Sequence, residues 1–438
     1  MIKRILLLGL LLMTGHYWCW GQQIFTDLPG LLHYAQQKSS KVRSGQIRLD
    51  QAKLTKVAAI LGVPDPSGSL SFSYTNNTRL PVNLFPAEIF GGPKGTFQEI
   101  QTGVQYLSNQ NFYAEIKLFN LEGWEKLKQS KLSMQSTLAD NQLQLKNLFD
   151  NIAALYSNIA NLSAQYQATQ QHLAIADTLR QLTHQKWEQG LAKPQDLNET
   201  EVNYLNTQAS LQQLQFLLQQ QHLALKVLCD IPLQDSLLVQ PVVPLENLAP
   251  NPEVNLNLLA SQRVEWQEKQ AWSSFRSTLF AQLPTVSLFF SSTRQQFNTR
   301  ARLFDQDQRW IPSSYLGVRL AVPIPSAQSV AQVGKARYDY ALAQEQANQT
   351  RIQARLQQQQ LVTEYQQALV QLKSNEAILR LHQDTYVKNR LNYNAGITSL
   401  EPTLRSYQAM VNSASNRINA AVSVLQAQSK IYINNTLK

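Results

Sequence analysis

The chain has 438 residues but only 16 glycines and 17 prolines, so it has few turns for its length and should consist of long secondary-structure elements. Charged residues make up 16% of the sequence, below the roughly 25% of an average soluble domain. The formal net charge is +10, yet no dense run of Lys or Arg follows Lys3 and Arg4, which argues against a nucleic-acid-binding protein.

Residues 1–21 are typical of a secretory signal peptide. Lys3 and Arg4 form its basic region and Ile5–Met13 its apolar region, and we expect cleavage near Gln22. An N-terminal membrane anchor is the less favoured alternative, because the apolar run is shorter than the ~20 residues that span a bilayer.

The sequence has two cysteines, Cys19 in the predicted signal peptide and Cys229 in the mature chain. A lipid attached at Cys19 is disfavoured, because Tyr17 and Trp18 are too bulky for the usual attachment motif. Cleavage leaves Cys229 as the single cysteine, so we expect no internal disulfide.

Residues 22–230 form the first of two predicted repeats. A helical zone at 26–61 is followed by strands near 67–75 and 109–119, with a loop rich in Asn, Pro and Gly between the strands. The second strand has an apolar and a polar face, formed by Ala114, Ile116 and Leu118 and by Glu115 and Lys117. This alternation is typical of a strand with lipid on one side and a lumen on the other, although an ordinary half-buried hairpin would share it.

A long helical hairpin follows at 124–230, with its tip at Gly190. No proline or glycine interrupts the stretch from Trp124 to Gln189. Apolar residues recur there at alternating spacings of three and four, which predicts a coiled coil: Met134, Leu138, Leu145, Leu148, Ile152, Leu155, Ile159, Leu162, Tyr166 and Leu173.

A proline-rich linker at 231–252 leads into the second repeat, residues 253–438. Strands are predicted near 284–292 and 315–323, and a second long hairpin at 328–435 has its tip at Gly396. The strand entries correspond, since PSGSLSFSY at 66–74 matches PTVSLFFSS at 284–292 in pattern. The two repeats should form one intertwined domain.

Four strands in one chain would leave exposed sheet edges. A symmetric trimer would supply three times four strands, and the resulting twelve are an even number permitted for an outer-membrane barrel. The fold class we predict is therefore mainly α with a β-barrel contribution, built from a duplicated unit of helix, two strands and a long helical hairpin. A small soluble four-stranded sheet is the alternative.

Motifs that carry catalysis are lacking in the sequence. It contains no Gly-rich phosphate loop, no His-Glu-x-x-His and no Gly-x-Ser-x-Gly. The histidines beyond the signal peptide have no metal-ligand spacing: His33, His172, His184, His222 and His382. We expect no enzyme activity, no cofactor and no metal site.

The order of these motifs resembles the TolC family of outer-membrane efflux proteins over nearly the whole mature chain. The pieces that carry the resemblance are the strand entry at 284–291, the strand LGVRLAVPI at 316–324, and the turns WEQGL at 187–191 and YNAGI at 393–397. The resemblance implies a homotrimer that takes part in transport, namely efflux. Its strands would form one β-barrel in the outer membrane, and its helices an α-helical barrel that extends into the periplasm.

The resemblance also implies the partners and sites of the chain. The tips at Gly190 and Leu191 and at Gly396 and Ile397 would dock onto a periplasmic adaptor, which joins the channel to an inner-membrane transporter. The alternative is that these glycines only end helices.

A periplasmic gate is implied near the tips. Asp196 and Tyr393 correspond to a pair that holds the closed state, with Asp196 accepting a hydrogen bond from the Tyr393 hydroxyl. The alternative is that Tyr393 is a seam residue and Asp196 a first-turn helix residue favoured by the helix dipole.

The chain departs from the family at the acidic ring of the constriction, where it has Pro402 and Arg405, with Glu401 one position away. We expect Arg405 to face the lumen there.

Two other functions compete with an export channel. A periplasmic adaptor protein would have one hairpin flanked by β-rich domains, and a filamentous coiled-coil protein would lack the strand pairs. The duplicated hairpins favour the channel. The sequence does not reveal the exported substrate or the class of transporter.

Overall fold

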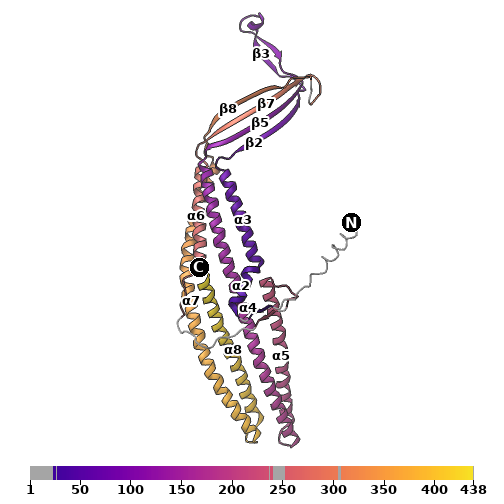
Figure 1. The fold of residues 1–438 in the computed structure, drawn as a ribbon, viewed down its shortest axis with the longest axis vertical. Helices are drawn as coiled ribbons and strands as arrows, with labels where there is room; N and C mark the ends of the chain where they lie inside the picture. The colour runs from indigo at the N-terminus through magenta and orange to yellow at the C-terminus, as the bar shows by residue number, and fades with distance from the viewer. Residues whose placement is uncertain (1–22, 26, 236, 240–251, 304–306, 438) are drawn as a thin grey trace, which may run out of the picture. The chain divides into compact units, whose positions relative to one another are not determined.

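The computed structural model describes residues 23–25, 27–235, 237–239, 252–303 and 307–437 (Figure 1). The predicted signal peptide and most of the predicted linker lie outside these ranges. The chain divides into two compact units. We call residues 49–137 and 264–347 the sheet unit, and the remaining residues the helical unit.

The sheet unit contains one antiparallel sheet of four strands in the order β2-β5-β7-β8. The strands are β2 (Ser67–Asn76), β5 (Tyr106–Phe119), β7 (Thr285–Asn298) and β8 (Ile311–Ala321). The two repeats meet at the central pair, where β5 lies beside β7. Strands β2 and β8 are the edges, each paired on one side only within the described chain.

All helices connected to the sheet leave it at the same end. Chain direction alternates along the sheet, so Asn76, Tyr106 and Asn298 lie together at the other, helix-free end. The helices connected to the sheet are α3 (Ser40–Leu61), α4 (Leu121–Glu188), α6 (Leu259–Phe280) and α7 (Ala327–Asn394).

Two segments expected to be loops contain strand. Strand β7 continues to Asn298, into the segment between the strands predicted near 284–292 and 315–323. The Asn-, Pro- and Gly-rich loop between the first two strands holds a separate hairpin, made of β3 (Val82–Pro86), the short 3-10 helix η1 (Ala87–Phe90) and β4 (Phe97–Gln101). We call it the β3–β4 hairpin.

The helical unit contains α2 (Leu28–Lys38), α5 (Pro194–Cys229), α8 (Leu400–Thr436) and parts of α4 and α7. A parallel pair of short strands, β1 (Gln23–Phe25) and β6 (Leu237–Val239), accompanies them. The largest apolar cluster joins α2, α4 and α5 around buried side chains from the predicted first seam, among them Leu148, Ile152 and Ile159.

The helical zone predicted as continuous at 26–61 breaks at Ser39, which has an extended backbone. Ser39 Oγ accepts a hydrogen bond from Lys41 N at 3.3 Å, as a residue at a helix N-cap does. A second contact comes from far along the chain. The Asp230 carboxylate accepts a hydrogen bond from Ser40 N at 2.5 Å, and this bond satisfies a backbone donor at the start of α3.

The second hairpin packs through α7 and α8 in the same way. Tyr365 and Leu372 of α7 meet Ala421 and Val424 of α8 in a buried cluster. In the described part of the chain, no helix is apolar over a stretch long enough to cross a bilayer.

Candidate functional site

The first candidate docking tip joins α4 to α5. The chain turns at Gly190, whose φ of +72° is rarely adopted by residues with a side chain. Gly190 N donates to Trp187 O at 2.9 Å and Leu191 N to Lys186 O at 2.7 Å, which closes the end of α4. The Leu191 side chain is 70% exposed, so the tip presents an apolar group on a fixed backbone.

The second tip repeats this geometry between α7 and α8. Gly396 has a φ of +74°, Gly396 N donates to Tyr393 O at 3.1 Å, and Ile397 N donates to Asn392 O at 2.9 Å. The Ile397 side chain is 72% exposed. Each glycine therefore ends a helix and also places an exposed apolar residue directly after it.

Tyr393 links the two hairpins near their tips. Its ring is buried beside Leu179 and Leu400, and its hydroxyl donates to Thr183 Oγ1 at 3.2 Å. Close by, Lys186 Nζ donates to Asn394 O at 3.2 Å and lies 5.0 Å from the centre of the Tyr393 ring. One neutral hydrogen bond and one charged donor thus join α4 to the end of α7.

The predicted hydrogen bond from Tyr393 to Asp196 is not formed in this chain. Asp196 lies in the first turn of α5, where its carboxylate accepts a hydrogen bond from Lys193 N at 3.0 Å. Its negative charge also interacts favourably with the positive end of the helix dipole. Burial raises the pKa of Tyr393, and the nearby Asp196 charge adds to this rise against the effect of Thr183.

Arg405 is exposed on the first turns of α8. Its guanidinium forms an ion pair of 2.6 Å with Glu401, one turn earlier, and both side chains are largely in solvent. They line an open cavity of about 380 Å³ together with His382, Asn389 and Pro402. An isolated exposed pair of this kind contributes little stability, so Arg405 is available to other partners.

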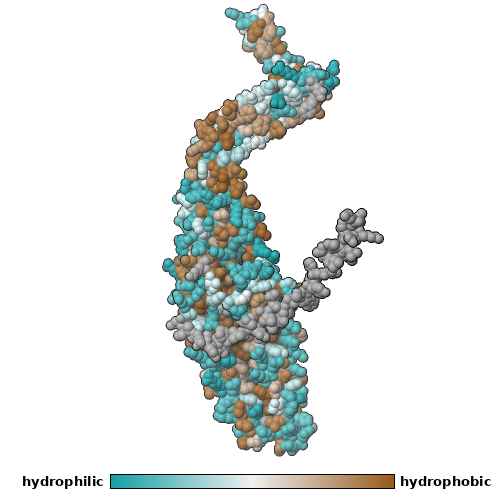
Figure 2. Space-filling model, in the orientation of Figure 1, coloured by the Kyte–Doolittle hydropathy of each residue, from teal (hydrophilic) through white to brown (hydrophobic). Residues whose placement is uncertain are grey.

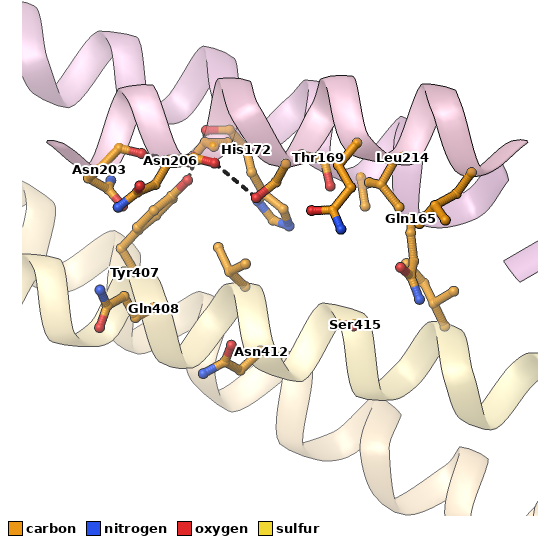
Figure 3. A pocket seen from close by; sticks show the side chains of 17 residues that line it. Gln165, Thr169, His172, Asn203, Asn206, Leu214, Tyr407, Gln408, Asn412 and Ser415 are labelled. Carbon is orange, nitrogen blue, oxygen red and sulfur yellow. Dashed lines mark hydrogen bonds between the residues drawn. The ribbon is translucent and has the colours of Figure 1, made fainter. Parts of the chain in front are cut away.

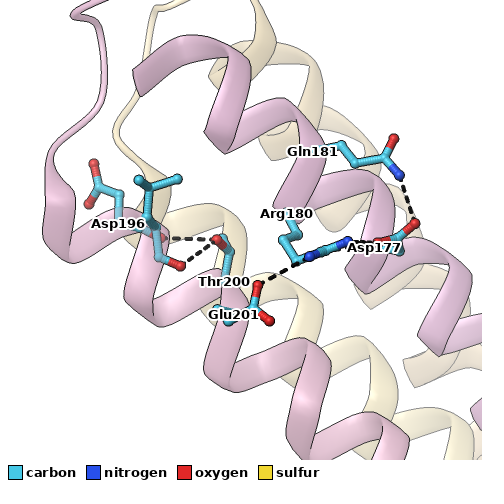
Figure 4. A network of polar contacts seen from close by, with 7 residues as sticks. Asp177, Arg180, Gln181, Asp196, Thr200 and Glu201 are labelled. Carbon is cyan, nitrogen blue, oxygen red and sulfur yellow. Dashed lines mark hydrogen bonds and ion pairs between the residues drawn. The ribbon is translucent and has the colours of Figure 1, made fainter. Parts of the chain in front are cut away.

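A polar network that we did not predict joins α4 to α5 above the first tip (Figure 4). Arg180 bonds Asp177 on its own helix at 2.8 Å and reaches across to Glu201 on α5 at 3.3 Å. Its guanidinium carbon also lies 4.7 Å from the centre of the Tyr204 ring. The only sequence signal is the spacing of Asp177 and Arg180 by three, which is common on exposed helices.

A cavity of about 570 Å³ lies between α4, α5 and α8 (Figure 3). Tyr407 reaches into it from α8, and its hydroxyl donates to the backbone oxygen of His172 at 2.9 Å. Burial raises the pKa of Tyr407 to about 12 and lowers that of His172, so both side chains are neutral at pH 7. The remaining lining is mostly Asn, Gln, Ser and Thr, without a carboxylate or a basic chain.

The four-stranded sheet has two unlike faces. One face is apolar and solvent-exposed, and Figure 2 shows hydrophobic residues gathered where the helices leave the sheet. Its members come from all four strands: Leu70, Phe72, Phe112, Ile116, Phe290, Leu316, Val318 and Leu320.

The opposite face of the sheet is polar. Arg319 lies 4.8 Å from the centre of the Phe289 ring and pairs with Glu115 at 3.2 Å, so an ion pair crosses from β8 to β5. Tyr113 donates to the same carboxylate. Such a charged cluster belongs in water rather than in lipid.

The sequence matches no protein-family model, and no curated protein is similar enough to count as a relative. Solved structures are similar in fold. The outer membrane protein VceC from Vibrio cholerae aligns with a TM-score of 0.73 and 16% identity, covering 93% of this chain and 95% of that one. The CmeC outer membrane channel of Campylobacter jejuni aligns with a TM-score of 0.73 and 14% identity, covering 93% of this chain and 85% of that one. The open MtrE outer membrane channel of Neisseria gonorrhoeae aligns with a TM-score of 0.64 and 14% identity, covering 93% of this chain and 88% of that one. The chain therefore has the fold of these outer-membrane proteins.

Proposed function

We propose that three copies of this chain form an outer-membrane channel that exports substrates delivered from an inner-membrane pump through a periplasmic adaptor. The observation that carries the proposal is the sheet with one exposed apolar face, one charged face and two open edges. Fold similarity to outer-membrane channels over 93% of the chain supports it.

Closure of the sheet requires further copies, and the strand directions permit it. Edge strand β8 runs toward the helix end and edge strand β2 runs away from it. Pairing β8 of one copy with β2 of the next therefore continues the antiparallel alternation without a break. Closure would remove the edges, turn the apolar face outward to lipid and turn the polar face inward to the lumen.

The two alternative functions explain less of the molecule. A periplasmic adaptor needs no sheet with an exposed apolar face, and the similar structures are channels. A filament needs no strands between its helices.

The mature protein should fractionate with the outer membrane and migrate as a detergent-resistant trimer. The test is separation of inner and outer membranes followed by electrophoresis of unheated and heated samples. A soluble periplasmic monomer would contradict the proposal.

The link between the hairpins is our proposed gate, with Tyr393 donating to Thr183 in place of Asp196. One such neutral bond contributes about 0.5–1.5 kcal/mol, and three copies in a trimer would hold the closed state together. Asp196 would act indirectly, by fixing the first turn of α5 beside this link.

Tyr393→Phe and Thr183→Ala should each raise single-channel conductance or open time in a planar bilayer, because both remove the same hydrogen bond. Tyr432→Phe, at an exposed tyrosine of α8, is the control and should change nothing. Unchanged conductance in both variants, with the trimer intact, would remove this link from gating and make Arg405→Ala the next variant to measure.

A further inference from the structure

His172 of α4 is a titratable side chain held inside the helical unit. Its two ring nitrogens are buried, and neither has a hydrogen-bond partner within the described chain. A neutral imidazole has one donor and one acceptor nitrogen, and the large majority of buried side-chain polar atoms in folded proteins have a partner. Neither the docking tips nor the link at Tyr393 accounts for this exception.

The imidazole lies in the seam where α4 packs against the second hairpin (Figure 3). Its ring meets the ring of Tyr407 on α8 edge-on, at 6.3 Å between centroids. The Tyr407 hydroxyl donates to the backbone oxygen of His172 at 2.9 Å, and the Tyr407 ring lies 5.6 Å from that of Tyr386 on α7. The His172 ring is therefore part of the packing that holds the two hairpins together at this level.

This seam continues into the proposed gate. A buried cluster that contains Ala176 and Tyr407 is followed toward the tips by a cluster that contains Leu179 and Tyr393. Ala176 and Leu179 are three residues apart on α4, so the two clusters are about one helical turn apart. A separation of α4 from α8 at this level would therefore disturb the link at Tyr393.

The helices around His172 carry no charge at its level. Charged residues are lacking from 151–176 of α4, from 202–225 of α5 and from 406–416 of α8. Tyr407 is the other titratable residue among those that line the cavity. A protonated imidazole would therefore be buried without a carboxylate to balance it, which is unfavourable.

The charges beyond these stretches do not compensate. Asp177 on α4 and Glu201 on α5 are the first carboxylates toward the tip, and both pair with Arg180. Tyr386 faces the seam from α7, and the charge beside its ring is positive, since the Arg390 guanidinium carbon lies 6.0 Å from the ring centre.

Burial lowers the pKa of His172 below its ordinary value of 6.5. The packed seam therefore favours the neutral ring, whereas an opened seam, in which water reaches the ring, lets it take up a proton near its ordinary pKa. The contribution of the neutral ring to the packed state is complete above a pH of about 6.5 and is lost progressively as the pH falls below that value.

From this geometry we propose that His172 is a pH-sensitive element, which loosens the seam between α4 and α8 when it is protonated and so releases the gate in mildly acidic surroundings. The inference rests on the proposed channel and adds a regulation that neither the docking tips nor the link at Tyr393 provides.

The test is the open probability of single channels in a planar bilayer at pH 7.5 and at pH 5.5. The wild type should be open about tenfold more at pH 5.5, since each imidazole shifts the equilibrium by up to about tenfold per pH unit below its ordinary pKa. His172→Phe should show no rise, because phenylalanine keeps a ring beside Tyr407 and the backbone acceptor but cannot be protonated. His33→Phe, at an exposed histidine of α2, is the matched control and should respond as the wild type does.

Thermal unfolding of the purified protein gives a second readout that does not depend on conduction. From pH 7.5 to pH 5.5 the unfolding midpoint should fall less in His172→Phe than in the wild type and in His33→Phe. His172→Gln, which also lacks a titratable ring, should behave as His172→Phe does.

Two outcomes separate this inference from the proposed function. Channels of the His172 variants that open at pH 5.5 as much as the wild type would overturn the inference and leave the proposed function standing. If no form of the protein conducts, the proposed channel fails, and the unfolding midpoints alone decide whether the seam responds to protonation of His172.

Discussion

Aspartate in place of both Leu191 and Ile397 will abolish export while the trimer remains in the outer membrane. Both side chains are more than two-thirds exposed at turns fixed by a glycine, so neither contributes to packing within the chain. If they dock on an adaptor, burying each contributes roughly 1.5–3 kcal/mol, and a carboxylate at the same place would be buried without a partner. Six altered contacts in a trimer would then prevent assembly with the adaptor.

The measurement is drug or dye efflux in cells together with chemical cross-linking to the adaptor. Gln189→Asp combined with Ala395→Asp is the matched control, because both residues are exposed and directly precede the two glycines. Normal efflux and normal cross-linking of the Leu191 and Ile397 variant would leave these glycines with the single role of ending their helices.

The fold class was predictable because its signals are periodic and long. A heptad pattern over more than five repeats requires a long partner helix, and strict alternation in β5 requires two unlike faces. The duplication adds a second, independent copy of each signal. The glycine turns were predictable for a related reason, since a lone glycine between two long apolar seams marks a chain reversal.

Contacts between distant segments escaped prediction. The start of α3 at Ser40 bonds Asp230, which lies 190 positions further along the chain and takes a left-handed conformation with a φ of 54°. The local signal is weak, since Ser39 and Ser40 favour a helix N-cap but no proline or glycine lies between Leu31 and Ser44. The partner of Tyr393 was missed for the same reason, since Thr183 is one of many small polar residues on α4 and becomes special only through its place beside α7.

The β3–β4 hairpin was missed because turn residues hide it. The segment contains Pro81, Pro86 and the Gly91-Gly92 pair, and such residues are typical of a loop. Alternation over five residues is too short to outweigh them. The two strands nevertheless pair over five residues each, from Val82 with Gln101 to Pro86 with Phe97.

Leu70→Arg will prevent assembly of the channel in the outer membrane, whereas Ser71→Arg will be tolerated. The two residues are neighbours on β2 and both are exposed, but they belong to opposite faces, because Leu70 pairs with Phe112 and Ser71 with Asn111. An arginine that faces lipid near the bilayer midplane costs about 2–4 kcal/mol per chain, and a trimer carries three of them. An arginine that faces a water-filled lumen keeps its hydration and costs little.

The pair isolates the direction of the side chain from every other effect, since both variants add the same charge to the same edge strand. The amount of heat-dissociable trimer in purified outer membranes is the measurement, with heat-denatured monomer as the reference for expression. Equal loss of trimer in both variants would mean that the strand edge, rather than the lipid face, is sensitive to charge. Equal tolerance would mean that the apolar face does not meet lipid, and the assignment of Leu316, Val318 and Leu320 to a membrane surface would fall with it.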